Sequence, residues 1–303
     1  MMTGPRSSCG GGTRMDQRDP GKRCNPRLAI VTAAVSLLAV PGPAWTQGFG
    51  AMAPETIVTA EASAPVEMTG YWVSLITENW RFRMMTAPKG DYTNIPLTPE
   101  GRRVADTWDP DADVANGEQC RVFGAPGLMR LPIRMHVTWQ DEETLRVETD
   151  FGEQTRTLHF GDAAPPREPT WQGHSRAEWE LVGQRMGAGP GGPTRTTGIG
   201  GLKVVTDHLR PGYLRRNGVP YSENAVVTEY FDRHDDLGEE WILHTRIVED
   251  PIYLNQRWVV TSHFKREPDD SKWNPQPCRV IPPPVIFTGA AQESRDPENP
   301  RPR

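Results

Sequence analysis

The sequence contains no uninterrupted apolar segment of the roughly 18–20 residues that a membrane-spanning helix needs. Its longest uncharged and mostly apolar run, Leu28 to Val40, has 13 residues and is followed by Pro41. A surplus of positive charge is also missing, because the formal net charge is -5. These absences argue against an integral membrane segment and against binding to nucleic acid through a broad basic surface.

The first 46 residues have the pattern of a secretory signal peptide. Six basic residues precede the apolar run, and small residues and prolines follow it. We therefore expect residues 1–46 to be removed and the protein to be periplasmic or secreted. These residues hold six of the 34 basic and two of the 39 acidic residues, so the remaining chain has 28 and 37, a net charge of -9.

Cysteine is scarce, and only Cys120 and Cys278 lie beyond the predicted leader. Two cysteines in an exported chain favour one disulfide between them, and two free thiols are the alternative. Such a disulfide would close a loop of 158 residues. In the chain-entropy model this closure stabilises a protein by about 4–5 kcal/mol.

Signals for long helices are also few, because 29 glycines and 30 prolines interrupt the chain. One short helix is predicted after Thr98, which is a good N-cap before Pro99, and residues 111–116 can add one turn. Most other segments alternate between apolar and polar residues, as half-buried strands do. The predicted strands are residues 70–78, 79–85, 133–140, 145–151, 154–160, 176–182, 202–209, 224–232, 240–248 and 257–265.

These strands predict a mainly β fold with a single domain over residues 68–278. Consecutive antiparallel strands avoid exposed edges best by closing on themselves. We therefore expect one antiparallel barrel of about 8–10 strands with one or two short helices. Residues 47–67 are predicted to be a linker, and residues 279–303 a disordered, proline-rich tail.

The first predicted strand carries a short family signature. Gly70-Tyr71-Trp72 resembles the G-x-W motif of lipocalins and related calycin barrels. The resemblance implies a lipocalin-like barrel in which Trp72 plugs one end. It also implies that a basic residue of the last strand packs on this ring, and Lys265 or Arg266 is in place to do so.

A wider resemblance covers nearly all of residues 68–278. The stretches TGYWVSLITENWRFRM, TDHLRPGYLRRNGVPYSENAVVTEYFDR and TSHFKREPDDSKWNPQPC look like a group of exported bacterial proteins of unassigned function. This resemblance implies export, a bacterial source and one domain. It carries no catalytic residues.

Histidines are the main candidates for chemistry. His136, His159 and His263 lie on the polar faces of their predicted strands, so they could meet Glu148 or Glu180 if those faces line the lumen. The alternative is that these faces point to water. Neither H-x-H nor H-E-x-x-H occurs in the chain, so no metal site and no cofactor is predicted.

Residues 207–221 are the candidate ligand-binding loop. They combine Arg210, Tyr213, Arg215 and Tyr221 with proline and glycine turns. At a barrel mouth these side chains could hold a polar or anionic ligand through arginine forks and tyrosine hydroxyls. The alternative is a solvated hairpin whose tyrosine rings cover the barrel end.

The leading hypothesis is an exported lipocalin-like barrel that binds a small, partly apolar molecule. A barrel enzyme of the isomerase, cyclase or lyase type is the first alternative, with His136, His208, His263 and Tyr213 as candidate catalytic residues. An envelope protein that binds other proteins is the second. A sizeable cavity between apolar faces would favour ligand binding. Histidines and carboxylates that converge in the cavity would favour catalysis. An exposed apolar patch would favour interaction with other proteins.

Overall fold

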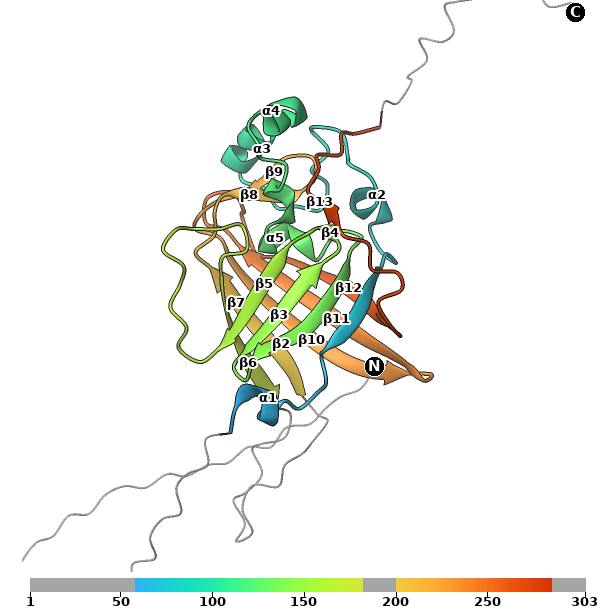
Figure 1. The fold of residues 1–303 in the computed structure, drawn as a ribbon. Helices are drawn as coiled ribbons and strands as arrows, with labels where there is room; N and C mark the ends of the chain where they lie inside the picture. The colour runs from blue at the N-terminus through green and yellow to red at the C-terminus, as the bar shows by residue number, and fades with distance from the viewer. Residues whose placement is uncertain (1–57, 182–199, 285–303) are drawn as a thin grey trace, which may run out of the picture. The chain divides into compact units, whose positions relative to one another are not determined.

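A computed structural model of the chain describes residues 58–181 and 200–284. The predicted signal peptide, most of the predicted linker and most of the predicted tail lie outside the described residues. Nine strands of the described part close into a barrel in the order β1-β12-β11-β10-β7-β6-β5-β3-β2 (Figure 1). They are β1 (Gly70–Leu75), β2 (Arg134–Asp141), β3 (Thr144–Thr149), β5 (Thr155–Phe160), β6 (His174–Leu181), β7 (Gly200–Asp207), β10 (Val226–Asp236), β11 (Glu239–Glu249) and β12 (Trp258–Glu267).

The barrel confirms the predicted mainly β class, but it is mixed rather than purely antiparallel. β5 and β6 run parallel, with Leu158 opposite Ser175. A parallel pair needs a crossover of about a dozen residues, and residues 161–173 supply it. The prediction of antiparallel strands only was wrong, because alternation within a strand does not reveal the direction of its neighbour.

Five short α-helices and one 3₁₀ turn accompany the strands in the described ranges, more than the one or two predicted. None of these helices has the length and apolar character of a membrane span. The helices are α1 (Ala60–Ser63), α2 (Trp80–Arg83), α3 (Pro99–Ala105), α4 (Pro110–Ala115) and α5 (Ala125–Leu128), and the 3₁₀ turn is η1 (Arg121–Phe123).

Local sequence explains three of these helices. α3 confirms the predicted start at Thr98, whose hydroxyl accepts a hydrogen bond from the Gly101 amide (2.9 Å). Asp109 caps α4 in the same way. α2 replaces the strand predicted over 79–85, because Asn79 adopts a left-handed conformation (φ 50°) that ends the extended path.

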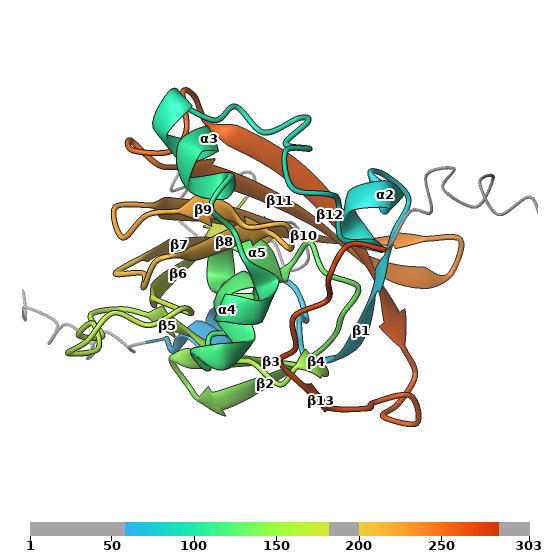
Figure 2. The same ribbon diagram turned by 90° about the horizontal axis from the view of Figure 1, so that it is seen from above.

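A short hairpin and a helical plug cover one end of the barrel. The hairpin pairs β8 (Gly212–Arg215) with β9 (Val219–Tyr221), and its turn includes Gly218, which has φ 78°. Beneath it, η1 and α5 bring Leu128 and Met129 into the same buried cluster as the lumen side chains. Figure 2, seen from above, shows α4, α5 and the hairpin over this end of the barrel. We call it the capped end.

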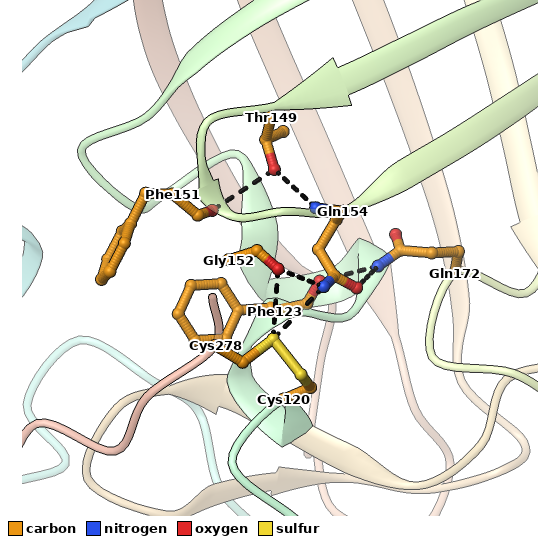
Figure 3. The surroundings of a disulfide bond; sticks show 8 residues. All are labelled: Cys120, Phe123, Thr149, Phe151, Gly152, Gln154, Gln172 and Cys278. Atoms are coloured by element: carbon orange, nitrogen blue, oxygen red, sulfur yellow. Dashed lines mark hydrogen bonds between the residues drawn. A yellow bond between two sulfur atoms is a disulfide. The ribbon is translucent and has the colours of Figure 1, made fainter. Parts of the chain in front are cut away.

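A disulfide between Cys120 and Cys278 ties the plug to the C-terminal segment, which confirms the predicted pairing (Figure 3). Just before Cys278, β13 (Gln276–Pro277) runs parallel to β4 (Phe151–Gly152). The carboxamide of Gln154 donates to the Gly152 carbonyl (2.5 Å) and lies 3.2 Å from the Cys278 sulfur. The disulfide joins two segments that are far apart in the sequence, and the strand pairing with β4 adds a third.

The folded part extends beyond the predicted limits of 68 and 278. On the N-terminal side, the indole of Trp179 donates to the carbonyl of Ala60 in α1 (2.9 Å). On the C-terminal side, the hydroxyl of Thr86 donates to the carbonyl of Ile281 (2.6 Å). The described ends of the predicted linker and tail are thus held against the barrel.

Candidate functional site

Large apolar side chains pack together inside the barrel. Trp72, Met135, Leu145 and Phe264 are each at most 1% exposed and belong to one buried apolar cluster. The plug continues this cluster at the capped end. Burying large side chains in this way stabilises the fold.

A cavity of about 210 Å³ lies at the capped end, outside the lumen. We call it the mouth cavity. Its walls come from the segment between α3 and α4, from α4 itself and from the β8–β9 hairpin. Aromatic rings and charged groups both face it, including those of Trp108, Asp113, Arg121, Tyr213 and Tyr221.

Asp113 organises one wall of the mouth cavity. The N-cap at Asp109 starts α4 so that Asp113 turns inward, and its side chain is buried. One carboxylate oxygen accepts hydrogen bonds from the Tyr213 hydroxyl (3.0 Å) and from Arg121 (3.2 Å), and the other accepts from the Trp108 indole (3.1 Å). Arg121 also lies over the Tyr213 ring, with Cζ 4.4 Å from its centroid. These contacts fix the wall in one arrangement.

The two tyrosines of the hairpin differ in their hydrogen bonding. Burial, together with the nearby Asp113, raises the pKa of Tyr213, so its hydroxyl stays protonated and donates. The Tyr221 hydroxyl is buried and has no hydrogen-bond partner among the described residues. It lies so close to Gly124 and Gly212 that a Cβ on either would approach it to 2.4 or 2.6 Å. A buried hydroxyl without a partner is costly, so the Tyr221 hydroxyl is an unsatisfied polar group of this hairpin.

Two of the four predicted ligand-binding residues, Tyr213 and Tyr221, therefore line the mouth cavity. Arg210 lies outside it, where it pairs with Glu118 (2.6 Å) and covers the Trp171 ring. Arg215 is buried elsewhere and donates to the Thr93 carbonyl (3.0 Å). The arginines support the loops around the cavity rather than line it.

The candidate catalytic histidines are not brought together. His136 faces outward, stacked on Tyr71 at 4.1 Å between ring centroids. His263 also faces outward, because its neighbours Ser262 and Phe264 are the ones buried in the lumen. His208 follows β7 in a left-handed conformation (φ 55°). The polar faces of these strands thus point away from the lumen and toward water, as the second of the two sequence-based expectations had it.

The lumen instead holds a cluster that the sequence did not single out. Glu229 of β10 accepts two hydrogen bonds from Arg156 of β5, Nη1–Oε1 at 3.2 Å and Nη2–Oε2 at 2.6 Å. His244 of β11 donates from Nε2 to the same Oε1 (3.0 Å). All three side chains are at most 1% exposed. Part of the signal was present in β10, where Glu229 lies at an inward position between the buried residues Val227 and Phe231.

Electrostatics fix the charges in this cluster. Burial alone would raise the pKa of Glu229, but the Arg156 charge and the bond from His244 hold it well below its usual range. Burial lowers the pKa of His244, so the imidazole is neutral near pH 7. Because Nε2 donates to an ionised carboxylate, Nδ1 carries the free lone pair. Oriented in this way, His244 is able to act as a general base toward a group that enters the lumen.

The predicted structural residues lie at the end of the barrel where β1 begins. Trp72 is fully buried, and the guanidinium of Arg266 lies over its ring, with Cζ 5.3 Å from the centroid. Lys265 lies elsewhere, pairing with Glu239 (2.5 Å). Gly70 has φ 110°, and a Cβ there would lie 2.9 Å from Arg266. Arg266, rather than Lys265, therefore covers the tryptophan.

A second hollow of about 380 Å³ lies beside the segment that follows α1. Its walls include Trp139, Trp179, Glu61 and Glu67. Glu67 is engaged by Thr69, whose amide and hydroxyl both donate to it. Among the residues that the structure describes, this hollow has no hydrogen-bond network like that of Asp113, so the mouth cavity is the better candidate.

The candidate site includes no recognisable metal centre. In residues 58–181 and 200–284 no group of three or more His, Cys, Asp or Glu side chains is arranged to hold a metal ion. Comparisons of the chain with protein-family models, with curated proteins and with solved structures found no match.

Proposed function

We propose that the protein is an exported, lipocalin-like barrel that binds a small, partly apolar molecule in the mouth cavity. The observation that carries this proposal is the joint presence of aromatic walls, a fixed Asp113–Arg121 pair and the unpartnered Tyr221 hydroxyl around one cavity. Ligand sites commonly combine apolar walls with a few such oriented polar groups.

The volume of the cavity limits the size of the ligand. At about 210 Å³ it is smaller than the roughly 300–1,000 Å³ of sites for drug-sized molecules. The occupant we propose is a fragment-sized molecule with an apolar or aromatic part. It carries a polar group that bonds to the Tyr221 hydroxyl.

Two observations support the remaining parts of the proposal. The Cys120–Cys278 disulfide favours an oxidising compartment, as expected for a periplasmic or secreted protein. The fully buried Trp72 under Arg266 fits the resemblance to lipocalins.

The test fills the cavity without disturbing the core. Ala112 lines the cavity and is exposed on α4, whereas Ala115 is exposed on the same helix but does not line the cavity. Ligand-detected NMR with a library of aromatic fragments should find binders to the wild type and to A115W, and these should lose binding to A112W. Equal binding to A112W would exclude the mouth cavity as the site.

The two alternatives have weaker support. For catalysis, the supporting observation is the oriented base His244, but it is 1% exposed and the predicted partners His136, His208, His263 and Tyr213 do not join it. For protein interaction, the supporting observation is the exposure of Trp80 and Met84 on and next to α2. Neither arrangement encloses a cavity as the capped end does.

A further inference from the structure

One layer of the lumen near the capped end contains more buried cations than carboxylates. Arg83, Arg130, Arg156 and Arg246 come from separate segments and are each at most 8% exposed. The carboxylates paired with arginines of this layer in the described residues are those of Glu78 and Glu229. His244 is neutral. Since a buried charge needs a counter-charge, the layer has two positive charges in excess.

Both carboxylates are already fully engaged. Glu78 pairs with Arg83 (2.6 Å) and with Arg130 (2.8 Å) through the same oxygen. Glu229 is held by the fork of Arg156 and by His244. Neither is hydrogen-bonded to Arg246, although Glu229 lies opposite it in the register of β10 and β11.

Arg246 is fully buried and incompletely paired. Its Nη1 donates to the Pro126 carbonyl of α5, and its guanidinium lies over the Trp258 ring (Cζ to centroid 5.0 Å). Nε and Nη2 have no hydrogen-bond partner in the part of the chain that the structure describes. Burial and the repulsion of Arg130 lower the pKa of Arg246 to about 9. A buried guanidinium with two unpaired N–H donors is expected to bind an anion.

The two unpaired donors define the shape of that anion. Nε–H and one terminal N–H lie on the same edge of the guanidinium plane and point in the same direction, which matches the two oxygens of a carboxylate. We infer that Arg246 binds a small carboxylate, of the size of formate or acetate, through this edge inside the lumen. Arg246 is fully buried, so we expect an acid with a long chain to bind more weakly than a short one. This site is separate from the mouth cavity and does not depend on the proposed function.

The first experiment measures thermal unfolding of the full chain in formate, acetate, octanoate or chloride at constant ionic strength. Formate at about ten times its Kd should raise the Tm by about 3–6 °C over chloride. The control R103M, at an exposed arginine of α3, should keep this shift, and R246M should lose it. An equal shift in chloride, a larger shift in octanoate, or a formate shift that persists in R246M would each overturn the inference.

A second measurement uses the wild type alone, in case R246M does not fold. The carbon resonance of [13C]formate should broaden when the protein is added and sharpen again when excess acetate displaces it. A resonance that stays sharp at every protein concentration would also overturn the inference.

Discussion

Arg156 and Glu229 form a two-pronged ion pair inside the barrel, although their side chains are only 1% and 0% exposed. The pair links β5 to β10 across the lumen. Such a pair is costly to break because the surviving charge stays buried without a partner. Replacing Arg156 by methionine should therefore lower the free energy of unfolding by about 3–5 kcal/mol, measured by denaturant titration.

The matched control is an ion pair of similar length on the outside of the barrel. Lys203 lies 2.6 Å from Glu178, whose side chain is 62% exposed. K203M should cost less than about 1 kcal/mol, because water screens exposed pairs. If R156M costs as little as K203M, Arg156 and Glu229 do not hold the lumen together.

The disulfide should account for a large part of the stability. Replacing both Cys120 and Cys278 by serine releases a loop with a sequence separation of 158. The chain-entropy model then predicts a loss of about 4–5 kcal/mol. Denaturant unfolding of the double variant should match that of reduced wild type. A double variant as stable as the oxidised wild type would contradict this prediction.

Acid should weaken the fold in two steps. Because the pKa of His244 in the folded state lies below its ordinary value of 6.5, its contribution is complete above pH 6.5 and is lost as the pH falls below it. Glu229, with a folded pKa far below 4.5, adds a second loss below pH 4.5. Thermal melts between pH 4.5 and 8, in buffers free of carboxylates, should show the first step.

Variants assign the first step to its residues. H244Q keeps a donor for Glu229 but does not titrate, so its Tm should fall less between pH 6.5 and 4.5 than that of the wild type. Burial also lowers the pKa of His174, and the H174Q/H244Q double variant should be nearly flat over this range. An unchanged slope in H244Q would mean that His244 does not carry the effect.

Much of the barrel could be predicted from the sequence because strand alternation is a local property. The run around Met135 and Val137 shows which residues face inward, and the leader left one possible disulfide partner for Cys120. The direction in which two strands pair depends on the path of the segment that connects them, and strand alternation does not reveal this path. The parallel pairing of β5 and β6 was therefore not predicted. The left-handed turn at Asn79, which converts a predicted strand into α2, is also decided by the fold around it.

The candidate site was harder to predict, for a physical reason. Polar strand faces usually point to water, so the conspicuous histidines of those faces, such as His136, lie outside the lumen. His244 instead faces inward on β11 beside the buried Ile242, and the Glu229 carboxylate satisfies its ring N–H. Glu229 is in turn paired with Arg156, which lies 73 residues earlier in the chain, so the cluster depends on the folded barrel and not on local sequence. Tyr213 and Tyr221 were identified because proline and glycine turns mark the hairpin that carries them.

The two basic residues at the end of β12 provide the last prediction. Arg266 covers the buried ring of Trp72 and pairs with Glu240 (3.1 Å), so R266A removes both a cation–π contact and the apolar cover of the ring. We expect it to cost about 1–2 kcal/mol in the free energy of unfolding. The neighbouring variant K265A is the control and should cost less than about 1 kcal/mol, because Lys265 pairs with the exposed Glu239 and lies over the half-buried Trp241 ring (Nζ to centroid 5.8 Å). The quenching of tryptophan emission by acrylamide should rise more in R266A, where the fully buried Trp72 loses its cover, than in K265A, where the half-buried Trp241 does. The reverse order of the two variants would assign the cover of Trp72 to Lys265.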